Sequence, residues 1–253
     1  MIFDRRRYGR DNYVYLLCEG RDAALVDPGD PAGAFALAEK HAVSPRFILH
    51  THGHRDHTGG TPEVASRFGA VVYGSGADSS WYRPDVDIGG RGDLSLGALR
   101  LRVHEVPGHT PGSVLYEWGG QLISGDTLFW GGAGNCKFGG DPARLAESFA
   151  GTIARLDGAL KVNPGHDYAE ANLLFALDLE PSNKWAQLQL ESSRRAHACG
   201  EELSPPALED ERRSNPFLRA GELGPLLAER GFSCANAREA FVLIRRLRDA
   251  WRT

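Results

Sequence analysis

Short hydrophobic runs alternate with segments of helix-forming composition over roughly the first two thirds of the chain. Runs rich in Val, Ile, Leu and Tyr predict strands, and the segments between them predict helices. The predicted strands are residues 12–18, 23–26, 46–49 and 70–73, and the predicted helices are residues 32–42 and 61–68. This order of strand, helix and strand is typical of a layered α/β fold, because each helix packs its apolar face on a sheet.

The pattern changes near residue 170, where β-branched residues become scarce and Ala, Leu, Glu and Arg dominate. Hydrophobic residues at helical spacing predict helices over 172–180, 183–198 and 236–251. The last of these has one apolar face, formed by Phe241, Ile244, Leu247 and Trp251. We therefore predict two domains, residues 1–168 with mixed structure and residues 169–253 with helices. By itself, the helical part is interpreted as a packing appendage or a dimerisation element.

The composition narrows the class of protein. With 29 basic and 33 acidic residues the formal net charge is −4, so no basic surface is expected to attract nucleic acid or anionic lipid. The chain has no run of about 18 apolar residues, and its first residues lack the apolar core of a signal peptide. The cysteines show no CxxC spacing, which argues against a disulfide framework: they are Cys18, Cys136, Cys199 and Cys234. These features predict a protein of the reducing cytoplasm without a membrane or nucleic-acid partner.

The strongest chemical signal is a dense group of metal-binding side chains after the strand predicted at 46–49. Six consecutive positions hold four of them, namely His52, His54, Asp56 and His57. His52 and His54 are two positions apart in an extended loop, so both can face one ion. Asp56 and His57 follow a turn and would point toward a second metal position. Imidazole with carboxylate suits zinc or iron better than calcium or magnesium. The alternative is a histidine-rich loop that binds metal adventitiously or not at all.

Three further candidate ligands each follow a strand-like run. They are His109 in a Pro-Gly turn, Asp126 beside a glycine, and His166 in a second Pro-Gly turn. A single histidine in a turn is more often a surface or capping residue. Three such residues at strand ends, together with the histidine-rich group, instead indicate one metal centre, because α/β folds place their sites at strand ends.

With these motifs the chain resembles the metallo-β-lactamase superfamily and, within it, the glyoxalase II (hydroxyacylglutathione hydrolase) family. The resemblance covers almost the entire chain. It implies an αββα sandwich followed by a small all-helical C-terminal domain. It also implies two divalent metal ions per chain, with Zn²⁺ expected first and iron or manganese as alternatives.

The same resemblance implies a role for each candidate ligand. The first ion would be held by His52, His54 and His109. The second ion would be held by Asp56, His57 and His166. Asp126 would bridge both ions together with a hydroxide, and the carboxylates of Asp56 and Asp126 would orient that hydroxide for attack on a carbonyl carbon.

A glutathione-binding site is also implied by the resemblance. The positions that match the family's substrate-binding residues are Lys137, Phe138, Tyr168, Arg245 and Arg248. The chain departs from the family at Gly139, where the family has a tyrosine, and its glycine-rich loop is one residue longer. An Asn-Pro-Phe segment at Asn215 also matches the family.

Asp27 follows the strand predicted at 23–26, before a Pro-Gly pair. Its carboxylate either caps this turn or, as the resemblance implies, hydrogen-bonds a ligand histidine and fixes its ring.

Taken together, the motifs and the resemblance predict a monomeric enzyme that hydrolyses an S-(2-hydroxyacyl)glutathione, such as S-lactoylglutathione, to a 2-hydroxy acid and glutathione. Three alternatives stay open at this point. The chain could be a thioesterase or lactonase with a non-glutathione substrate, a persulfide dioxygenase-like protein with a single iron, or a non-catalytic thiol-binding protein. A nuclease is disfavoured by the acidic net charge.

Overall fold

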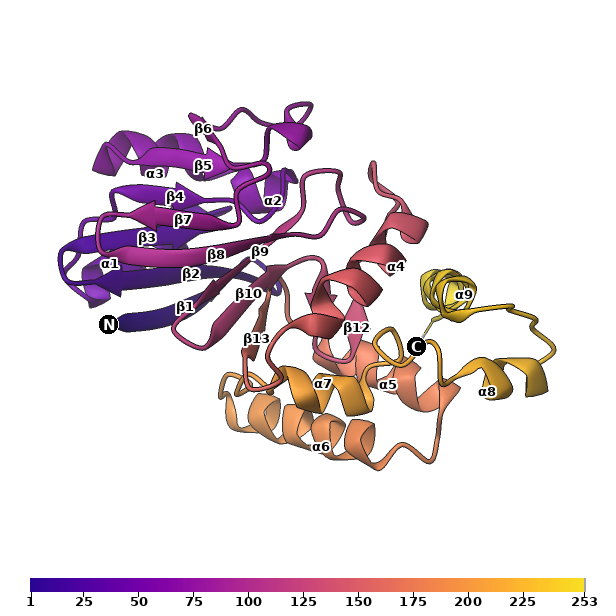
Figure 1. Cartoon of the computed structure of the whole chain (residues 1–253). Helices are drawn as coiled ribbons and strands as arrows, with labels where there is room; N and C mark the ends of the chain where they lie inside the picture. The colour runs from indigo at the N-terminus through magenta and orange to yellow at the C-terminus, as the bar shows by residue number, and fades with distance from the viewer. Residues whose placement is uncertain (253) are drawn as a thin grey trace.

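Two β-sheets lie face to face in the computed structural model, which describes residues 1–252 (Figure 1). The first sheet is formed, in spatial order, by β1 (Ile2–Tyr8), β2 (Asn12–Glu19), β3 (Asp22–Val26), β4 (Phe47–Leu49), β5 (Val71–Gly74) and β6 (Val86–Asp87). The second is formed by β13 (Lys161–Pro164), β10 (Gln121–Gly125), β9 (Val114–Trp118), β8 (Leu99–Glu105) and β7 (Asp93–Leu96). A two-stranded hairpin of β11 (Leu128–Phe129) and β12 (Gly132–Ala133) follows β10.

Strand β2 is buried on both faces because its side chains alternate between two hydrophobic cores. Tyr13, Tyr15 and Leu17 belong to the core between the sheets. Val14 and Leu16 belong to the core between the first sheet and its helices. This explains why the segment is almost continuously apolar in the sequence rather than alternating with polar residues.

Two helices cover the outer face of the first sheet, α1 (Pro31–Lys40) and α3 (Thr61–Phe68) (Figure 1). The Asp30 side chain caps α1 by accepting a hydrogen bond from the Gly33 N–H at 2.9 Å. Because helices connect them, β3, β4 and β5 run parallel. Their C-terminal ends therefore lie at one edge of the sheet.

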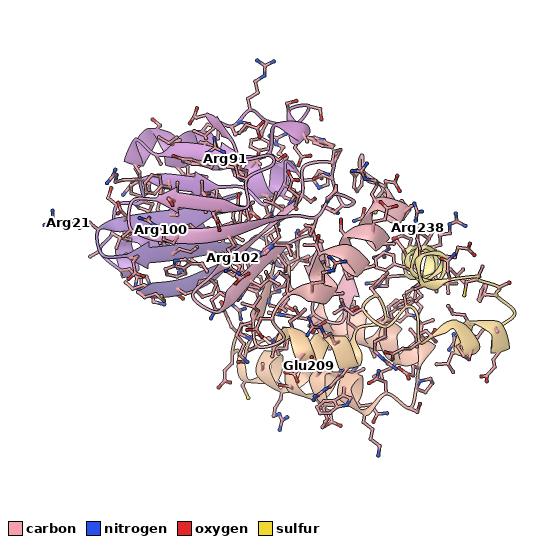
Figure 2. All side chains as sticks on the ribbon, viewed as in Figure 1. Arg21, Arg91, Arg100, Arg102, Glu209 and Arg238 are labelled. Atoms are coloured by element: carbon pink, nitrogen blue, oxygen red, sulfur yellow. The ribbon has the colours of Figure 1, made fainter. Side chains whose placement is uncertain are left out.

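In the second sheet, β8 has one buried and one exposed face. Leu99, Leu101 and Val103 are buried, and the intervening Arg100 and Arg102 are exposed. Figure 2 shows the two arginines on the outside of this sheet. The alternation is that of a half-buried antiparallel strand.

The chain after β13 is helical. It forms α5 (Ala169–Leu179), α6 (Lys184–Cys199), α7 (Leu208–Ser214), α8 (Gly224–Glu229) and α9 (Ala237–Ala250). Helix α9 packs on α4 (Pro142–Gly151), where the rings of Phe149 and Phe241 lie 4.9 Å apart. One hydrophobic cluster runs from the second sheet into these helices, which stand beside one end of the sandwich (Figure 1).

The predicted α/β class and helical C-terminal region are confirmed, and the predicted helices lie within a few residues of α1, α3, α5, α6 and α9. The division into two domains at residue 168 stays a prediction. Strand β1 was not predicted, because Asp4 and three arginines interrupt its apolar pattern. It forms by pairing along its whole length with β2, at the sheet edge, where polar side chains are tolerated. Within residues 1–252, no helix has the length and apolar character needed to span a membrane.

Candidate metal centre

The predicted ligands come from loops that meet at one end of the sandwich. His52 and His54 follow β4, and α2 (Arg55–Thr58) begins directly after His54. The carboxyl ends of β10 and β13 bring Asp126 and His166 to the same place, because these strands pair in parallel. His109 arrives from the turn between β8 and β9. Four segments far apart in the sequence thus contribute to one site.

The structure gathers these side chains into two adjacent groups. The ligand atoms within each group lie within 4.8 Å of one another. The first group contains His52, His54 and His109. The second group contains Asp56, His57 and His166. A third combination joins two of these histidines to a nearby aspartate, namely Asp27, His52 and His57.

Asp126 lies between the two groups. Its Oδ1 is 3.3 Å from His57 Nε2, and its Oδ2 is 3.4 Å from His166 Nε2. Toward the other group, Oδ2 is 3.7 Å from His109 Nε2. The carboxylate can therefore reach ions held by either group.

The donor atoms present fit transition-metal ions. His52 Nε2 and Asp126 Oδ1 are buried, and within residues 1–252 neither makes a hydrogen bond of acceptable geometry. Leaving such atoms unpaired is costly, and cations held by the two groups would satisfy both. Imidazoles with a few carboxylates are the donor set of zinc, iron and manganese sites in proteins.

Carboxylates dominate the electrostatics of the site. Burial alone would lower the pKa of His57, but the carboxylates of Asp126 and Asp27 outweigh it and raise that pKa to about 10. The pKa of His166 is likewise raised to about 11, against burial and mainly by Asp126. Burial holds the pKa of His52 well below its ordinary value. The site therefore attracts positive charge, and metal ions compete there with protons.

The buried Asp27 carboxylate lies behind the predicted ligand side chains. Its Oδ1 accepts a hydrogen bond from the Thr51 N–H at 2.8 Å, and its Oδ2 lies 3.1 Å from His57 Nδ1. Burial would raise the pKa of this carboxyl, but the imidazoles of His50, at 3.6 Å, and of His57 outweigh burial and lower it. The Asp27 carboxylate thus holds one ligand ring and the loop that carries two others.

The sequence analysis missed two aspartates that support the ligands. Asp11, at the turn between β1 and β2, lies 2.8 Å from His166 Nδ1 through its Oδ1. Asp78 is fully buried and accepts hydrogen bonds from the backbone N–H groups of Gly53 and Gly112. Neither lies in a recognisable motif, because each acts on a loop that is distant in the sequence.

The ligand groups open into a cavity of about 600 Å³. All five predicted substrate-binding residues line it, and they are Lys137, Phe138, Tyr168, Arg245 and Arg248. The Tyr168 ring stacks on His166 with centroids 4.8 Å apart. Lys137 Nζ lies 3.7 Å from Asp249 Oδ1, and Arg248 donates to Asn172 Oδ1 at 3.3 Å.

Arg245 differs from the other four because it is only 5% exposed. Its Nη1 donates to the Ala133 carbonyl at 2.6 Å, and its Nη2 donates to Asp249 at 2.9 Å. Its guanidinium therefore holds the glycine-rich loop in place at the cavity wall. The loop passes so close to the site that a Cβ atom on Gly134 would lie 1.9 Å from the Asp126 carbonyl oxygen.

A sandwich of two sheets with these ligand groups at one end defines the class of protein. The family model of the metallo-beta-lactamase superfamily matches residues 7–251, so the chain belongs to that superfamily. Among solved structures, ETHE1 from Myxococcus xanthus has a similar fold, with a TM-score of 0.69 at 24% identity over 97% of this chain and 90% of that one. TTHA1623 in a di-iron-bound form gives a TM-score of 0.64 at 25% identity, over 85% of this chain and 100% of that one.

Within the superfamily, the relatives named hydroxyacylglutathione hydrolase define the family to which this chain belongs. The protein of that name from Anaeromyxobacter dehalogenans is 61% identical over 98% of this chain and 99% of its own length. The protein of the same name from Methylobacillus flagellatus is 37% identical over 94% of this chain and 95% of its own length. The cytoplasmic hydroxyacylglutathione hydrolase of Arabidopsis thaliana is 34% identical over 96% of both chains.

Proposed function

We propose that this chain is a metal-dependent thioester hydrolase that cleaves S-(2-hydroxyacyl)glutathione, such as S-lactoylglutathione, into a 2-hydroxy acid and glutathione. The observation that carries the proposal is the position of Asp126, whose carboxylate faces histidines of both ligand groups at the floor of the cavity. The names of the relatives support the same substrate class.

Three histidines would hold one ion, namely His52, His54 and His109. The second ion would be held by Asp56, His57 and His166, with Asp126 reaching both. Two divalent ions bound by these groups would lower the pKa of a water molecule toward 7 and polarise the thioester carbonyl. We propose zinc, with iron or manganese as alternatives, and the di-iron form of TTHA1623 supports the presence of two ions.

The remaining steps belong to the side chains around the ligands. Asp56 and Asp126 can accept hydrogen bonds from the attacking water and hold it in line with the acyl carbon. The water oxygen adds to that carbon and the C–S bond breaks. One proton of the water ends on the glutathione sulfur, and the other belongs to the carboxylic acid product, which releases it to solvent.

The glutathione half of the substrate carries two carboxylates, which would pair with cationic side chains of the cavity. Lys137 and Arg248 are the proposed partners. Arg245 and the phenol of Tyr168 would contact the same half, whereas Phe138, whose ring lies near His54, would add apolar contact to the acyl half. Glutathione thioesters thus fit this cavity better than uncharged lactones do.

The relatives favour hydrolysis over the persulfide dioxygenase-like and non-catalytic alternatives. The name of the plant relative supports a cytoplasmic location. A monomeric state remains a prediction.

A substrate comparison with metal analysis tests the proposal. The protein loaded with Zn²⁺, Fe²⁺ or Mn²⁺ is assayed with S-lactoylglutathione, with lactoyl-coenzyme A and with the lactoyl thioester of a simple thiol. We expect two ions per chain and a clear preference in kcat/KM for the glutathione thioester. Equal rates on all three thioesters would contradict the glutathione preference and indicate a general thioesterase. Full turnover after complete metal removal would overturn the mechanism.

A further inference from the structure

The cavity lining contains two chemically different groups of side chains. The cationic group comes from the loop before α4, from α9 and from the residues after α9, and it consists of Lys137, Arg248 and Arg252. The second group, named here the aromatic wall, consists of the rings of Trp81 and Phe138, which both lie near His54. These rings are 40% and 66% exposed. Large apolar side chains exposed within a cavity indicate a surface that a ligand covers.

The backbone of Trp81 is attached to a buried aspartate. The backbone N–H of Trp81 donates to the Asp78 carbonyl at 3.0 Å. The Asp78 carboxylate in turn accepts hydrogen bonds from the Gly53 N–H at 2.8 Å and from the Thr110 hydroxyl at 2.8 Å. The indole ring stands edge-on to His54, with centroids 5.3 Å apart. The backbone of Trp81 is therefore tied to the same aspartate that holds the loops carrying His54 and His109.

Gly139 makes room for the indole. A Cβ atom at this position would lie 2.7 Å from Trp81 Cη2, closer than any side chain could approach without displacing the ring. The φ angle of Gly139 is +88°, a conformation that L-residues rarely adopt. The departure from the family at Gly139 thus has a physical counterpart in this chain, because Trp81 fills the adjacent space.

We propose that Trp81 and Phe138 form the acyl subsite, and that this chain prefers 2-hydroxyacyl groups with an aryl or large alkyl substituent over the small lactoyl group. This proposal rests on the proposed function. The anionic glutathione half would pair with the cationic side chains, and the reacting carbonyl must lie over the ligand groups. The acyl substituent then extends toward His54, where the aromatic wall offers it apolar contact.

The test compares S-mandeloylglutathione, which carries a phenyl group, with S-lactoylglutathione on the metal-loaded protein. In the wild type we expect the higher kcat/KM for the mandeloyl thioester. In W81A the ratio of the two kcat/KM values should fall roughly tenfold, since an aromatic contact is removed. W81F keeps a smaller ring and should give an intermediate ratio.

W185A is the matched control, because Trp185 is 45% exposed on α6 and does not line this cavity. Its ratio should equal that of the wild type. An unchanged ratio in W81A and W81F, or an equal loss on both substrates, overturns the acyl subsite. Should W81A fail to fold in a thermal melt, the W81F ratio decides in the same way.

Binding of two thioethers separates this proposal from the proposed function. Calorimetry with S-benzylglutathione and S-methylglutathione involves no hydrolysis. We expect the benzyl compound to bind more tightly to the wild type and most of this difference to vanish in W81A. If neither thioester is hydrolysed, only the proposed hydrolase function is contradicted. If S-benzylglutathione and S-methylglutathione bind with equal affinity, only the acyl subsite at the aromatic wall is contradicted.

Discussion

The His166 Nδ1–H donates a hydrogen bond of 2.8 Å to Asp11 Oδ1, although the two residues are 155 positions apart in the sequence. The bond fixes the imidazole ring and its tautomer. The other nitrogen, Nε2, then faces the carboxylates of Asp56 at 3.2 Å and Asp126 at 3.4 Å. Asp11 therefore sets the direction in which one predicted ligand presents its lone pair.

Replacing Asp11 with alanine should weaken binding of the ion held by Asp56, His57 and His166. Loss of such a supporting carboxylate lowers metal affinity by about 10–100-fold. Titration with a competing chelator, with metal content measured on the equilibrated protein, checks this. D11N keeps an oxygen that can accept the same hydrogen bond and should recover part of the affinity.

The matched control for Asp11 is Asp93→Ala, since Asp93 is exposed at the start of β7. This variant should bind both ions like the wild type. Retention of both ions with unchanged affinity in D11A would show that the ring of His166 is held by other contacts.

The contrast between Asp11 and the ligands shows what the sequence could reveal. The ligands at 52–57 stand out because six positions contain four metal-binding groups, and His109, Asp126 and His166 each follow a strand. Asp11 and Asp78 lie in ordinary turns, and their roles arise only when strands pair. The same holds for Trp81, whose place in the cavity depends on the three-dimensional approach of Gly139.

Strand β1 illustrates the same limit for the fold. Its arginines give no apolar alternation, so the local sequence favours an exposed segment. The strand forms because β2 offers an edge for hydrogen bonding along its whole length. Local periodicity predicted the strands and helices with a buried face, whereas pairing and loop contacts depend on residues distant in the sequence.

His54→Ala should remove the ion of the first group and leave the second group largely able to bind its own. His54 Nδ1 is 3.0 Å from His109 Nε2, so the two nitrogens converge on one position. We expect metal content to fall from two ions toward one, and turnover to fall by more than about a hundredfold as polarisation of the carbonyl is lost. His104→Ala is the control, because His104 on β8 pairs with Glu117 on β9 and belongs to neither ligand group. Two ions in purified H54A would contradict the assignment.

Asn215→Ala should destabilise the hairpin of β11 and β12 that follows Asp126. The fully buried Asn215 amide donates to the carbonyls of Phe129 at 3.2 Å and Gly132 at 2.9 Å. Each buried carbonyl left without a partner costs on the order of 1–3 kcal/mol, so we expect a loss of about 3 kcal/mol in the free energy of unfolding. Urea denaturation measures it. A midpoint equal to that of the wild type would mean that water replaces the amide at both carbonyls.

Glu211 should make the protein less stable as the pH rises from about 4.5 to about 7. This buried carboxyl accepts a hydrogen bond from the Gly131 N–H at 2.8 Å, yet burial raises its pKa to about 7, above its ordinary value of 4.5. The folded state therefore holds the proton more tightly than the unfolded state. The stability it contributes is fully present below about pH 4.5 and is lost as the pH rises through 7.

Glu211→Gln keeps an oxygen acceptor for Gly131 but cannot ionise, so the difference in unfolding free energy between E211Q and the wild type isolates this group. We expect that difference to shift in favour of E211Q by about 2–3 kcal/mol between pH 5 and pH 9. Glu209→Gln, on an exposed position of the same helix, should show no such shift. If the stability curves of E211Q and the wild type stay parallel from pH 5 to 9, Glu211 is ionised in the folded protein throughout that range. Its charge would then be stabilised by the Gly131 N–H and by the Asn215 amide, which donates to it at 3.0 Å.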